Sequence, residues 1–241
     1  MHSYCFFFAT CLPSLLTIPV STIPDAFDWR TNDMVTYVKD QINHYAPLGW
    51  AFSVVASIET RQAIQKNMSS ARSLSFQQIL DCTKDQPGTR AGAMDYIYRK
   101  GLMRLSDYNT KMPGECNYER DRIGARIKDY AILRNINERQ MASMLVEHGP
   151  FTVGVKRSTL EKYKKGTIME DHQKYRNVST DHSVVVVGFG QDSKTNIPYW
   201  IIKNSWGINW GNKGYAFLKR SESQLAENTA GMAQKVIIAL L

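Results

Sequence analysis

The spacing of hydrophobic residues changes character near the middle of the chain. Between residues 47 and 101, apolar side chains recur at helical intervals. Pro47 suits the first turn of a helix, because the N–H that proline lacks has no partner there. Ser75 is placed to cap a helix, and Gly101 is placed to end one. The pattern predicts helices over Trp50–Asn67, Ser75–Asp81 and Ala91–Lys100, followed by a loop-rich stretch over Leu102–Asn117 with a turn at Pro113–Gly114.

The second half of the chain carries strand signals after one more helix. Asn137 is placed to cap a helix over Glu138–His148, which Gly149 and Pro150 end. Beyond it, short apolar runs alternate with turns that contain Gly or Pro. A helical half followed by a strand-rich half predicts an α+β fold with two lobes. The predicted strands are Phe151–Val155, Ser183–Phe189, Tyr199–Ile202 and Gly214–Leu218, and an extended segment begins the ordered chain at Ile23–Arg30.

Composition is typical of a globular protein with a basic surface. The chain has 241 residues, of which 43% are hydrophobic, enough for one large domain or two small lobes. The formal net charge is +8, and the basic residues are scattered. No basic run is interleaved with aromatic residues as in a nucleic-acid-binding surface, so we expect a solvated basic surface and no nucleic-acid partner.

The first 22 residues resemble a leader. They contain no Lys, Arg, Asp or Glu, and their apolar block Cys5–Leu16 has the length of a signal-peptide core. That block is too short to span a membrane, and no later stretch is long enough, so we expect no membrane association. A basic residue, which would strengthen the signal, is absent from the start. Asn67 and Asn177 begin glycosylation patterns of the kind found in secreted or lysosomal proteins.

Two of the four cysteines remain when the leader is set aside. Cys82 and Cys116 have no His or Cys at metal-ligand spacing, so the sequence predicts no metal site. In an oxidising compartment we expect them to form a disulfide that closes a loop of about 34 residues. Such a bridge contributes roughly 3–4 kcal/mol in the chain-entropy model. The alternative is two unpaired buried thiols.

Several segments match one protein family in the same order along the chain. The most specific are a Trp-Ala-Phe-Ser run at a helix start, an Asp-His pair before a strand, and an Asn-Ser-Trp-Gly run after another strand. With these motifs the chain resembles the papain-like cysteine peptidases, and most of all their cathepsin L type, from about Ile23 onward. The matching segments are Gln41–Ser53, Ser73–Cys82, Gly88–Tyr96, Thr180–Gly190, Tyr199–Gly207 and Asn228–Ala233.

The resemblance implies a papain-like fold for residues 23–241. In that fold a helical N-terminal lobe and a β-barrel-like C-terminal lobe enclose a cleft. The helical lobe would cover roughly residues 45–130 and the strand-rich lobe roughly residues 131–228. Residues 23–44 and the C-terminus would cross over between the lobes.

The resemblance also implies roles for individual residues. His182 would be the general base, Asn204 would orient it through a side-chain hydrogen bond, and Gln41 would donate to the oxyanion. Cys82 and Cys116 match one family disulfide. The substrate cleft would be lined by Ala91, Gly92, Met94, Gly154, Asp181 and Trp206.

The chain departs from the family at the nucleophile. Gly49 stands where the family has its catalytic cysteine, and no Cys, Ser or Thr lies between Gln41 and Trp50. Glycine has no side chain, so it cannot form the thioester on which this chemistry depends. Gln41 to Trp50 spans nine positions, about two more than in the family, so we expect Gln41 to be displaced from oxyanion-hole geometry.

Other departures come in matched sets. Thr89 and Ala230 each replace one cysteine of a family disulfide, and the stretches that should hold the partners contain none. Ala91 replaces a cleft glycine and would narrow the groove slightly. The inhibitory propeptide of the family is missing between residues 22 and 23, which fits either an inactive homologue or a truncated gene model.

These observations predict a catalytically inactive homologue that is secreted or lysosomal, monomeric and without a cofactor. Its cleft would bind peptides or protein protease inhibitors, as a decoy or competitor. One alternative is a structural remnant whose motifs only hold the fold. Another is a weakly active cysteine-type endopeptidase of the lysosome or extracellular space. Ser53 lies one helical turn after Gly49 and would point away from His182, so we do not expect it to substitute as nucleophile.

Overall fold

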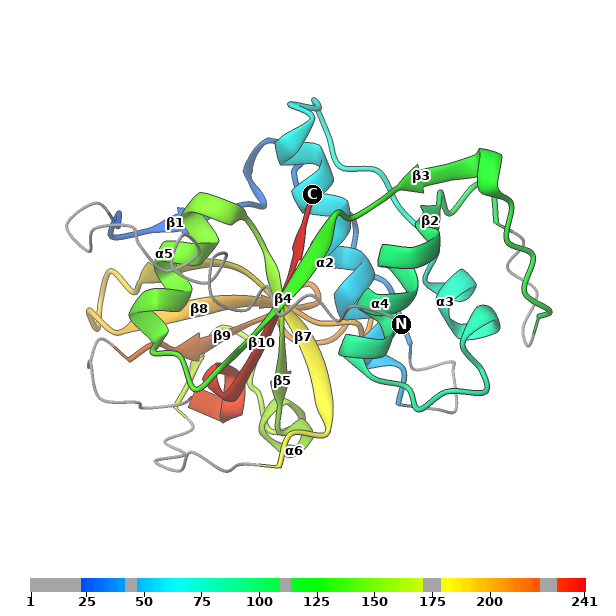
Figure 1. Cartoon of the computed structure of the whole chain (residues 1–241). Coiled ribbons are helices and arrows are strands. Elements are labelled where there is room, and N and C mark those ends of the chain that lie inside the picture. Colours follow the sequence, from blue (N-terminus) through cyan, green and yellow to red (C-terminus); the bar gives the residue numbers. More distant parts are fainter. Residues whose placement is uncertain (1–22, 42–46, 109–113, 171–178, 222–228) are drawn as a thin grey trace.

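A long helix separates a group of short helices from a twisted sheet (Figure 1). The computed structural model describes residues 23–41, 47–108, 114–170, 179–221 and 229–241. The leader prediction for residues 1–22, Asn177 and the Pro113 half of the predicted turn lie outside the described residues. The predicted α+β architecture of two lobes is confirmed.

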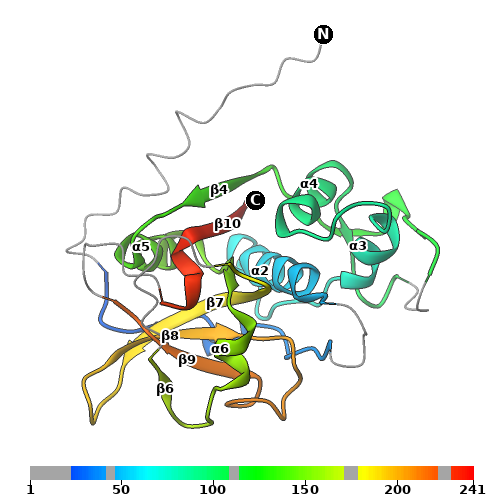
Figure 2. The same cartoon turned by 90° about the horizontal axis from the view of Figure 1, so that it is seen from below.

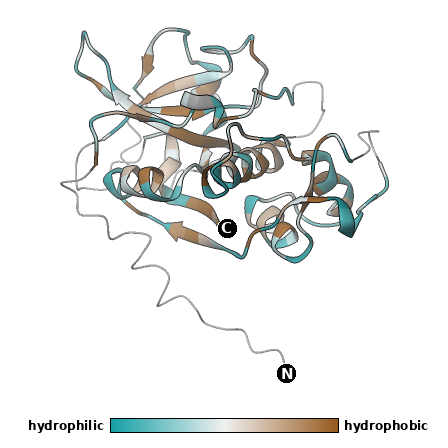
Figure 3. Cartoon of the chain, turned by 90° about the horizontal axis from the view of Figure 1, so that it is seen from above, coloured by the Kyte–Doolittle hydropathy of each residue, from teal (hydrophilic) through white to brown (hydrophobic). Residues whose placement is uncertain are grey.

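The long helix α2, Gly49–Gln65, is buried along most of its length. Figures 1 and 2 both place it between the sheet and the short helices. In Figure 3 the hydrophobic colour is concentrated on this central helix and the strands beside it. Its polar side is buried too, because Glu59 accepts hydrogen bonds from Lys39 Nζ at 2.7 Å and Thr36 Oγ1 at 2.5 Å. The helix therefore joins the two lobes by an apolar face and by a buried ion pair.

The helical lobe contains the short helices that the sequence predicts. Helix α3, Phe76–Cys82, is capped by the Ser75 hydroxyl, which accepts from Gln78 N at 3.1 Å. Helix α4, Arg90–Lys100, is capped by Thr89 and ends at Gly101, whose φ of 81° favours glycine. The lobe also contains β2 (Leu102–Met103), β3 (Ile123–Ala125) and the 3-10 turn η3 (Arg120–Arg122).

The second lobe is built on a sheet with strand order β4-β10-β5-β7-β8-β9-β6, in which β1 also pairs with β7. The pairs are antiparallel except β6 with β9. The strands are β1 (Phe27–Asp28), β4 (Asp129–Arg134), β5 (Phe151–Val155), β6 (Ile168–Met169), β7 (His182–Gln191), β8 (Pro198–Lys203), β9 (Tyr215–Lys219) and β10 (Lys235–Leu240).

One helix packs against this sheet beside its inner strand β7. Helix α5, Glu138–His148, begins with the predicted Asn137 cap, and Gln140 completes a capping box with it. The remaining short elements are α6 (Arg157–Glu161) and the 3-10 turns η2 (Thr31–Asp33) and η4 (Thr229–Gln234).

Strands β4 and β10 were not predicted from the sequence, although β10 ties the lobes together. Its residues alternate between two cores, as the period of a strand requires. Val236 and Ile238 pack in the core of the sheet lobe, and Ile237 and Ala239 pack in the core of the helical lobe. Because both faces of β10 are buried, the strand lacks the alternation of apolar and polar residues that reveals a half-exposed strand.

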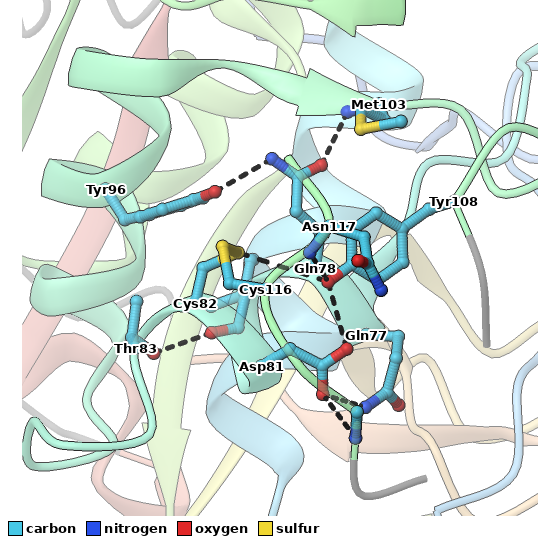
Figure 4. Close-up of a disulfide and its surroundings, with 12 residues drawn as sticks. Gln77, Gln78, Asp81, Cys82, Thr83, Tyr96, Met103, Tyr108, Cys116 and Asn117 are labelled. Atoms are coloured by element: carbon cyan, nitrogen blue, oxygen red, sulfur yellow. Dashed lines mark hydrogen bonds between the residues drawn. A yellow bond between two sulfur atoms is a disulfide. The ribbon is translucent and has the colours of Figure 1, made fainter. Parts of the chain in front are cut away.

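The predicted disulfide between Cys82 and Cys116 is present (Figure 4). It joins the end of α3 to a loop 34 residues further along the chain. Hydrogen bonds surround it: Tyr108 Oη donates to Asp81 Oδ2 at 3.0 Å, and Met103 N donates to Gln78 Oε1 at 2.7 Å. The alternative of two free buried thiols is thereby wrong.

Candidate active-site cleft

Helix α2 begins at the cleft with a residue that has no side chain. Gly49 is its first residue and is buried. A Cβ added there would lie 2.6 Å from His182 Cε1, 2.7 Å from His182 Nδ1 and 3.2 Å from the Ser183 carbonyl oxygen. The imidazole therefore occupies the space that a side chain at position 49 would need.

His182 is fixed on its other side by an amide and an indole. It is the first residue of β7, and its Nε2 lies 2.8 Å from Asn204 Oδ1. The same oxygen accepts from Ser205 N at 2.9 Å, so it faces the ring as an acceptor. His182 consequently donates from Nε2, and its Nδ1 lone pair is directed toward Gly49. The ring of Trp206 lies over the imidazole, with 4.9 Å between the ring centroids.

The electrostatic environment keeps this imidazole neutral. Burial lowers the pKa of His182 below its ordinary value, and the Arg157 guanidinium lowers it further. The hydrogen bond that His182 donates to Asn204 Oδ1 and the charges of Asp181 and Glu161 oppose this lowering of the pKa. A neutral imidazole can accept a proton at Nδ1, as a general base must.

Gln41 is held beside this pair. It is buried, its Oε1 accepts from Ser205 Oγ at 2.6 Å, and its backbone N–H donates to the Ser205 carbonyl at 2.8 Å. Gln41 is not among the described residues that line the cleft pocket. Residues 42–46 lie outside the described part of the chain, so the displacement of Gln41 from oxyanion-hole geometry stays a prediction.

No hydroxyl replaces the missing thiol within the described residues. There the His182 ring hydrogen bonds only to Asn204. Ser53 Oγ donates to Trp50 O at 3.2 Å and accepts from Thr152 Oγ1 at 2.8 Å. Ser53 is thus engaged with the core on the side of α2 that faces β5, in line with the direction predicted for it.

A pocket of about 300 Å³ lies next to His182. Asp181 lines it, as the family resemblance implied, whereas Ala91 and Gly92 in the first turn of α4 do not. Trp206 lies over His182 from outside this pocket. Its lining residues are Pro47, Gly49, Trp50, Gly88, Thr89, Arg90, Thr180, Asp181, His182, Ser183 and Lys235.

The assignment of Met94 to the cleft is wrong. Met94 has no exposed surface and packs in the core of the helical lobe. Helical periodicity puts it on the same face of α4 as Ala93 and Ile97, which is the face packed toward the core. Gly154 is also buried and does not line the pocket, but it lies next to the lining residue Thr180, because a Cβ there would lie 2.6 Å from Thr180 Oγ1.

Two basic residues of the pocket were missed by sequence reasoning. Arg90 follows the cap residue Thr89 directly, in a turn that the sequence already pointed to. Lys235 is the first residue of the unpredicted strand β10. Only the pairing of β10 with β5 brings it near Arg90, and no local signal in the sequence reveals that proximity.

The remaining predictions concern the surface. Asn67 is exposed just after α2, and its modification stays a prediction. Within the described residues, no group of three or more His, Cys, Asp or Glu side chains is placed to hold a metal ion. None of the helices described is both long and apolar enough to cross a membrane.

Comparison with known proteins places this geometry in a family. The sequence profile described as "Papain family cysteine protease" matches residues 23–240. The chain belongs to the papain family of cysteine proteases. The family recognised from the motifs, with cathepsins among its members, is confirmed.

Curated members of the papain family align with most of this chain. Cathepsin F of Drosophila melanogaster is 31% identical over 229 residues, which are 91% of this chain and 36% of that protein. Cathepsin O of Homo sapiens is 33% identical over 230 residues, which are 92% of this chain and 67% of that protein. The chain thus spans only part of the length of these relatives.

Solved structures of the papain family have the same fold. The bromelain protease from Ananas comosus, in complex with the E64 inhibitor, aligns with a TM-score of 0.79 at 32% identity, covering 91% of this chain and all of that one (100%). Digestive procathepsin L 3 of Tenebrio molitor aligns with a TM-score of 0.80 at 28% identity, covering 93% of this chain and 71% of that one. The catalytic roles of individual residues stay predictions.

Proposed function

We propose that this chain is a catalytically inactive papain-family homologue whose cleft binds peptides or protein protease inhibitors. The observation that carries the proposal is the contact between Gly49 and His182. The backbone of Gly49 lies so close to the imidazole that even a Cβ would be 2.7 Å from Nδ1. Without a thiol or hydroxyl at position 49, the imidazole has no side-chain nucleophile there to activate for covalent catalysis.

Residual catalysis does not offset this loss. Removing one member of a catalytic triad leaves about 10³–10⁴-fold acceleration over water, far below a working peptidase. Within the described residues, the Ser53 hydroxyl is hydrogen-bonded to Thr152, and the His182 ring forms a hydrogen bond only with Asn204. The weakly active endopeptidase is therefore the less favoured reading.

Binding is favoured over a purely structural role by the shape of the cleft. A pocket of about 300 Å³ is within the range of ligand sites. Its wall is built from fixed parts: the start of α2, the start of β7, and Trp50, whose indole lies 2.6 Å from where a Cβ of Gly88 would be. A rigid concave wall loses little entropy when a peptide binds.

Direct titration tests this proposal. The purified protein is titrated with cystatin-type inhibitors and with a peptide library, by fluorescence polarisation and calorimetry. We expect saturable binding with a Kd below about 100 µM, which corresponds to roughly 5–6 kcal/mol. Thr180→Trp should fill the pocket and abolish binding, whereas Lys194→Trp, on an exposed turn away from the pocket, should not. If no ligand binds more tightly than 100 µM, the structural remnant is the correct interpretation.

We also propose that the chain functions in an oxidising compartment, secreted or lysosomal. The Cys82–Cys116 disulfide supports this, because such bridges persist outside the cytosol. Expression in cultured secretory cells should yield protein in the medium or in lysosomes. Glycosidase treatment should lower the mass of the protein, and Asn67→Gln or Asn177→Gln should make this mass difference smaller. Protein confined to the cytosol, with Cys82 and Cys116 as free thiols, would contradict the proposal.

A further inference from the structure

The pocket beside His182 has a basic end. Arg90 and Lys235 both line it, although 145 positions separate them in the chain. They come together because Arg90 begins α4 and Lys235 begins β10. Asp181 is the one carboxylate among the described lining residues, and it lies next to His182 in the chain.

The Arg90 guanidinium is buried and held in a fixed orientation. Its Nη1 donates to the Thr152 carbonyl at 2.8 Å and to the Lys235 carbonyl at 3.1 Å. Gly154 makes room for it, because a Cβ at that position would lie 2.9 Å from Arg90 Nη2. Burial lowers the pKa of Arg90 to about 10, so the side chain is still a cation at neutral pH.

Lys235 adds a second positive charge to the same place. Burial lowers its pKa, and so do the neighbouring charges of Arg90 and Arg134. Like charges held together repel one another, and an anion between them relieves that repulsion. Within the part of the chain that the structure describes, no carboxylate pairs with either Arg90 or Lys235.

Asp181 does not neutralise this basic end. Its Oδ1 accepts from the backbone N–H of Arg157 at 2.6 Å, and its charge acts on His182. The pocket therefore contains two cations without a paired carboxylate among the described residues, and one carboxylate, Asp181, that is engaged with the backbone of Arg157.

We infer that this basic end binds the carboxylate of an aspartate or glutamate side chain in a peptide held by the cleft. The inference rests on the proposed binding function and names the class of peptide. A guanidinium with fixed geometry and a flexible ammonium suit a carboxylate, because charge-assisted hydrogen bonds are the strong ones. An uncharged amide of the same shape gains no such interaction.

Matched peptides test the inference. Positional scanning of N-acetylated, C-amidated peptides first identifies the position at which an acidic residue is selected. A peptide with Glu there should bind about tenfold more tightly than its Gln counterpart, as one charge-assisted contact predicts. Raising the salt concentration should narrow the ratio. A peptide whose only carboxylate is a free C-terminus should show no such gain.

Variants at position 235 test whether the preference for Glu comes from the basic end of the pocket or from the overall positive charge of the protein. Lys235→Gln should reduce the Glu-to-Gln preference to about threefold or less, and Lys235→Glu should abolish or reverse it. Lys194→Gln, a matched loss of one charge on an exposed turn, should keep the full ratio. Lys235 is partly exposed, whereas Arg90 donates to two core carbonyls, so a change at Arg90 is less suitable because it would disturb the fold.

Each other outcome has a defined meaning. Equal binding of the Glu and Gln peptides, or an unchanged ratio in Lys235→Gln, overturns this inference and leaves the proposed binding function intact. A tenfold gain from a free C-terminus alone also overturns it. If neither peptides nor inhibitors bind at all, both the inference and the proposed function are wrong.

Discussion

Replacing Gly49 by cysteine restores the missing sulfur and should still not restore a peptidase. The new Cβ would lie 2.6 Å from His182 Cε1 and 2.7 Å from Nδ1. Both distances are shorter than ordinary van der Waals contact, which begins at 3.4 Å, so the ring or the start of α2 must shift. The ring cannot retreat freely, because Asn204 holds Nε2 at 2.8 Å and Trp206 lies over its face.

The cost follows from these contacts. Overpacking a closely packed site destabilises by about 1–3 kcal/mol. Weakening the hydrogen bond between His182 and Asn204 destabilises the fold by up to about 1 kcal/mol more. Replacing glycine by cysteine at the first position of α2 recovers only roughly 0.3 kcal/mol of helix propensity, because cysteine ranks well below alanine. We therefore expect Gly49→Cys to lower the free energy of unfolding by about 1–4 kcal/mol.

Urea unfolding and a fluorogenic peptidase assay measure both consequences. Gly49→Ala is the matched control, since it adds the same Cβ without the sulfur and should show a similar loss of stability. Gly49→Ala has no thiol and should be inactive. Gly49→Cys should also fall short of family-like turnover, because a displaced imidazole and the lengthened Gln41–Trp50 segment would not fit the reaction. Family-like turnover by Gly49→Cys, or unchanged stability in both variants, would refute this reasoning.

Three further predictions concern two buried side chains and the disulfide. Because burial lowers the pKa of His182 below its ordinary 6.5, the unfolded chain takes up the proton first, so the free energy of unfolding should fall as pH drops below about 6.5. His182→Gln should lose part of that fall, and an imidazole that titrates by NMR above 6.5 would contradict it. Lys203, whose pKa burial lowers to about 7 from 10.5, should make the protein more stable as pH rises from about 7 to 10. Lys203→Met should remove this rise in urea titrations, and an unaltered slope would count against it. Replacing Cys82 and Cys116 together by serine should lower the free energy of unfolding by roughly 3–4 kcal/mol, and a loss below about 1 kcal/mol would show that the bridge does little.

Local features of the fold could be predicted from the sequence. The caps Ser75 and Asn137 mark where α3 and α5 begin, because their side chains satisfy free N–H groups of the first turn. Gly101 marks the end of α4 by its positive φ. The predicted strand over Phe151–Val155 matches β5 at both ends. These signals act over a few residues, so they can be read without the tertiary structure.

Features that depend on distant contacts could not be predicted in the same way. Strand β10 is buried on both faces and shows no alternation, so its role between the two cores stays hidden in the sequence. Met94 lies in a motif that suggested the cleft, yet the orientation of α4 buries it. The pairing of His182 with Asn204 could be expected only from the family motifs, since 22 residues separate them and no local rule joins them.

The central claim is that no side chain in the described part of the cleft can act beside His182 as a nucleophile toward a carbonyl carbon. The most direct test is to incubate the unaltered protein with a covalent thiol-directed probe and map any adduct by peptide mass spectrometry. Mapping distinguishes an adduct in the cleft from an adduct at Cys5 or Cys11, which lie outside the described residues. Peptide turnover is measured in parallel, with His182→Ala as control. The account predicts no adduct at any residue of the cleft and the same background turnover in both proteins. An adduct in the cleft, or turnover that His182→Ala abolishes, would contradict it.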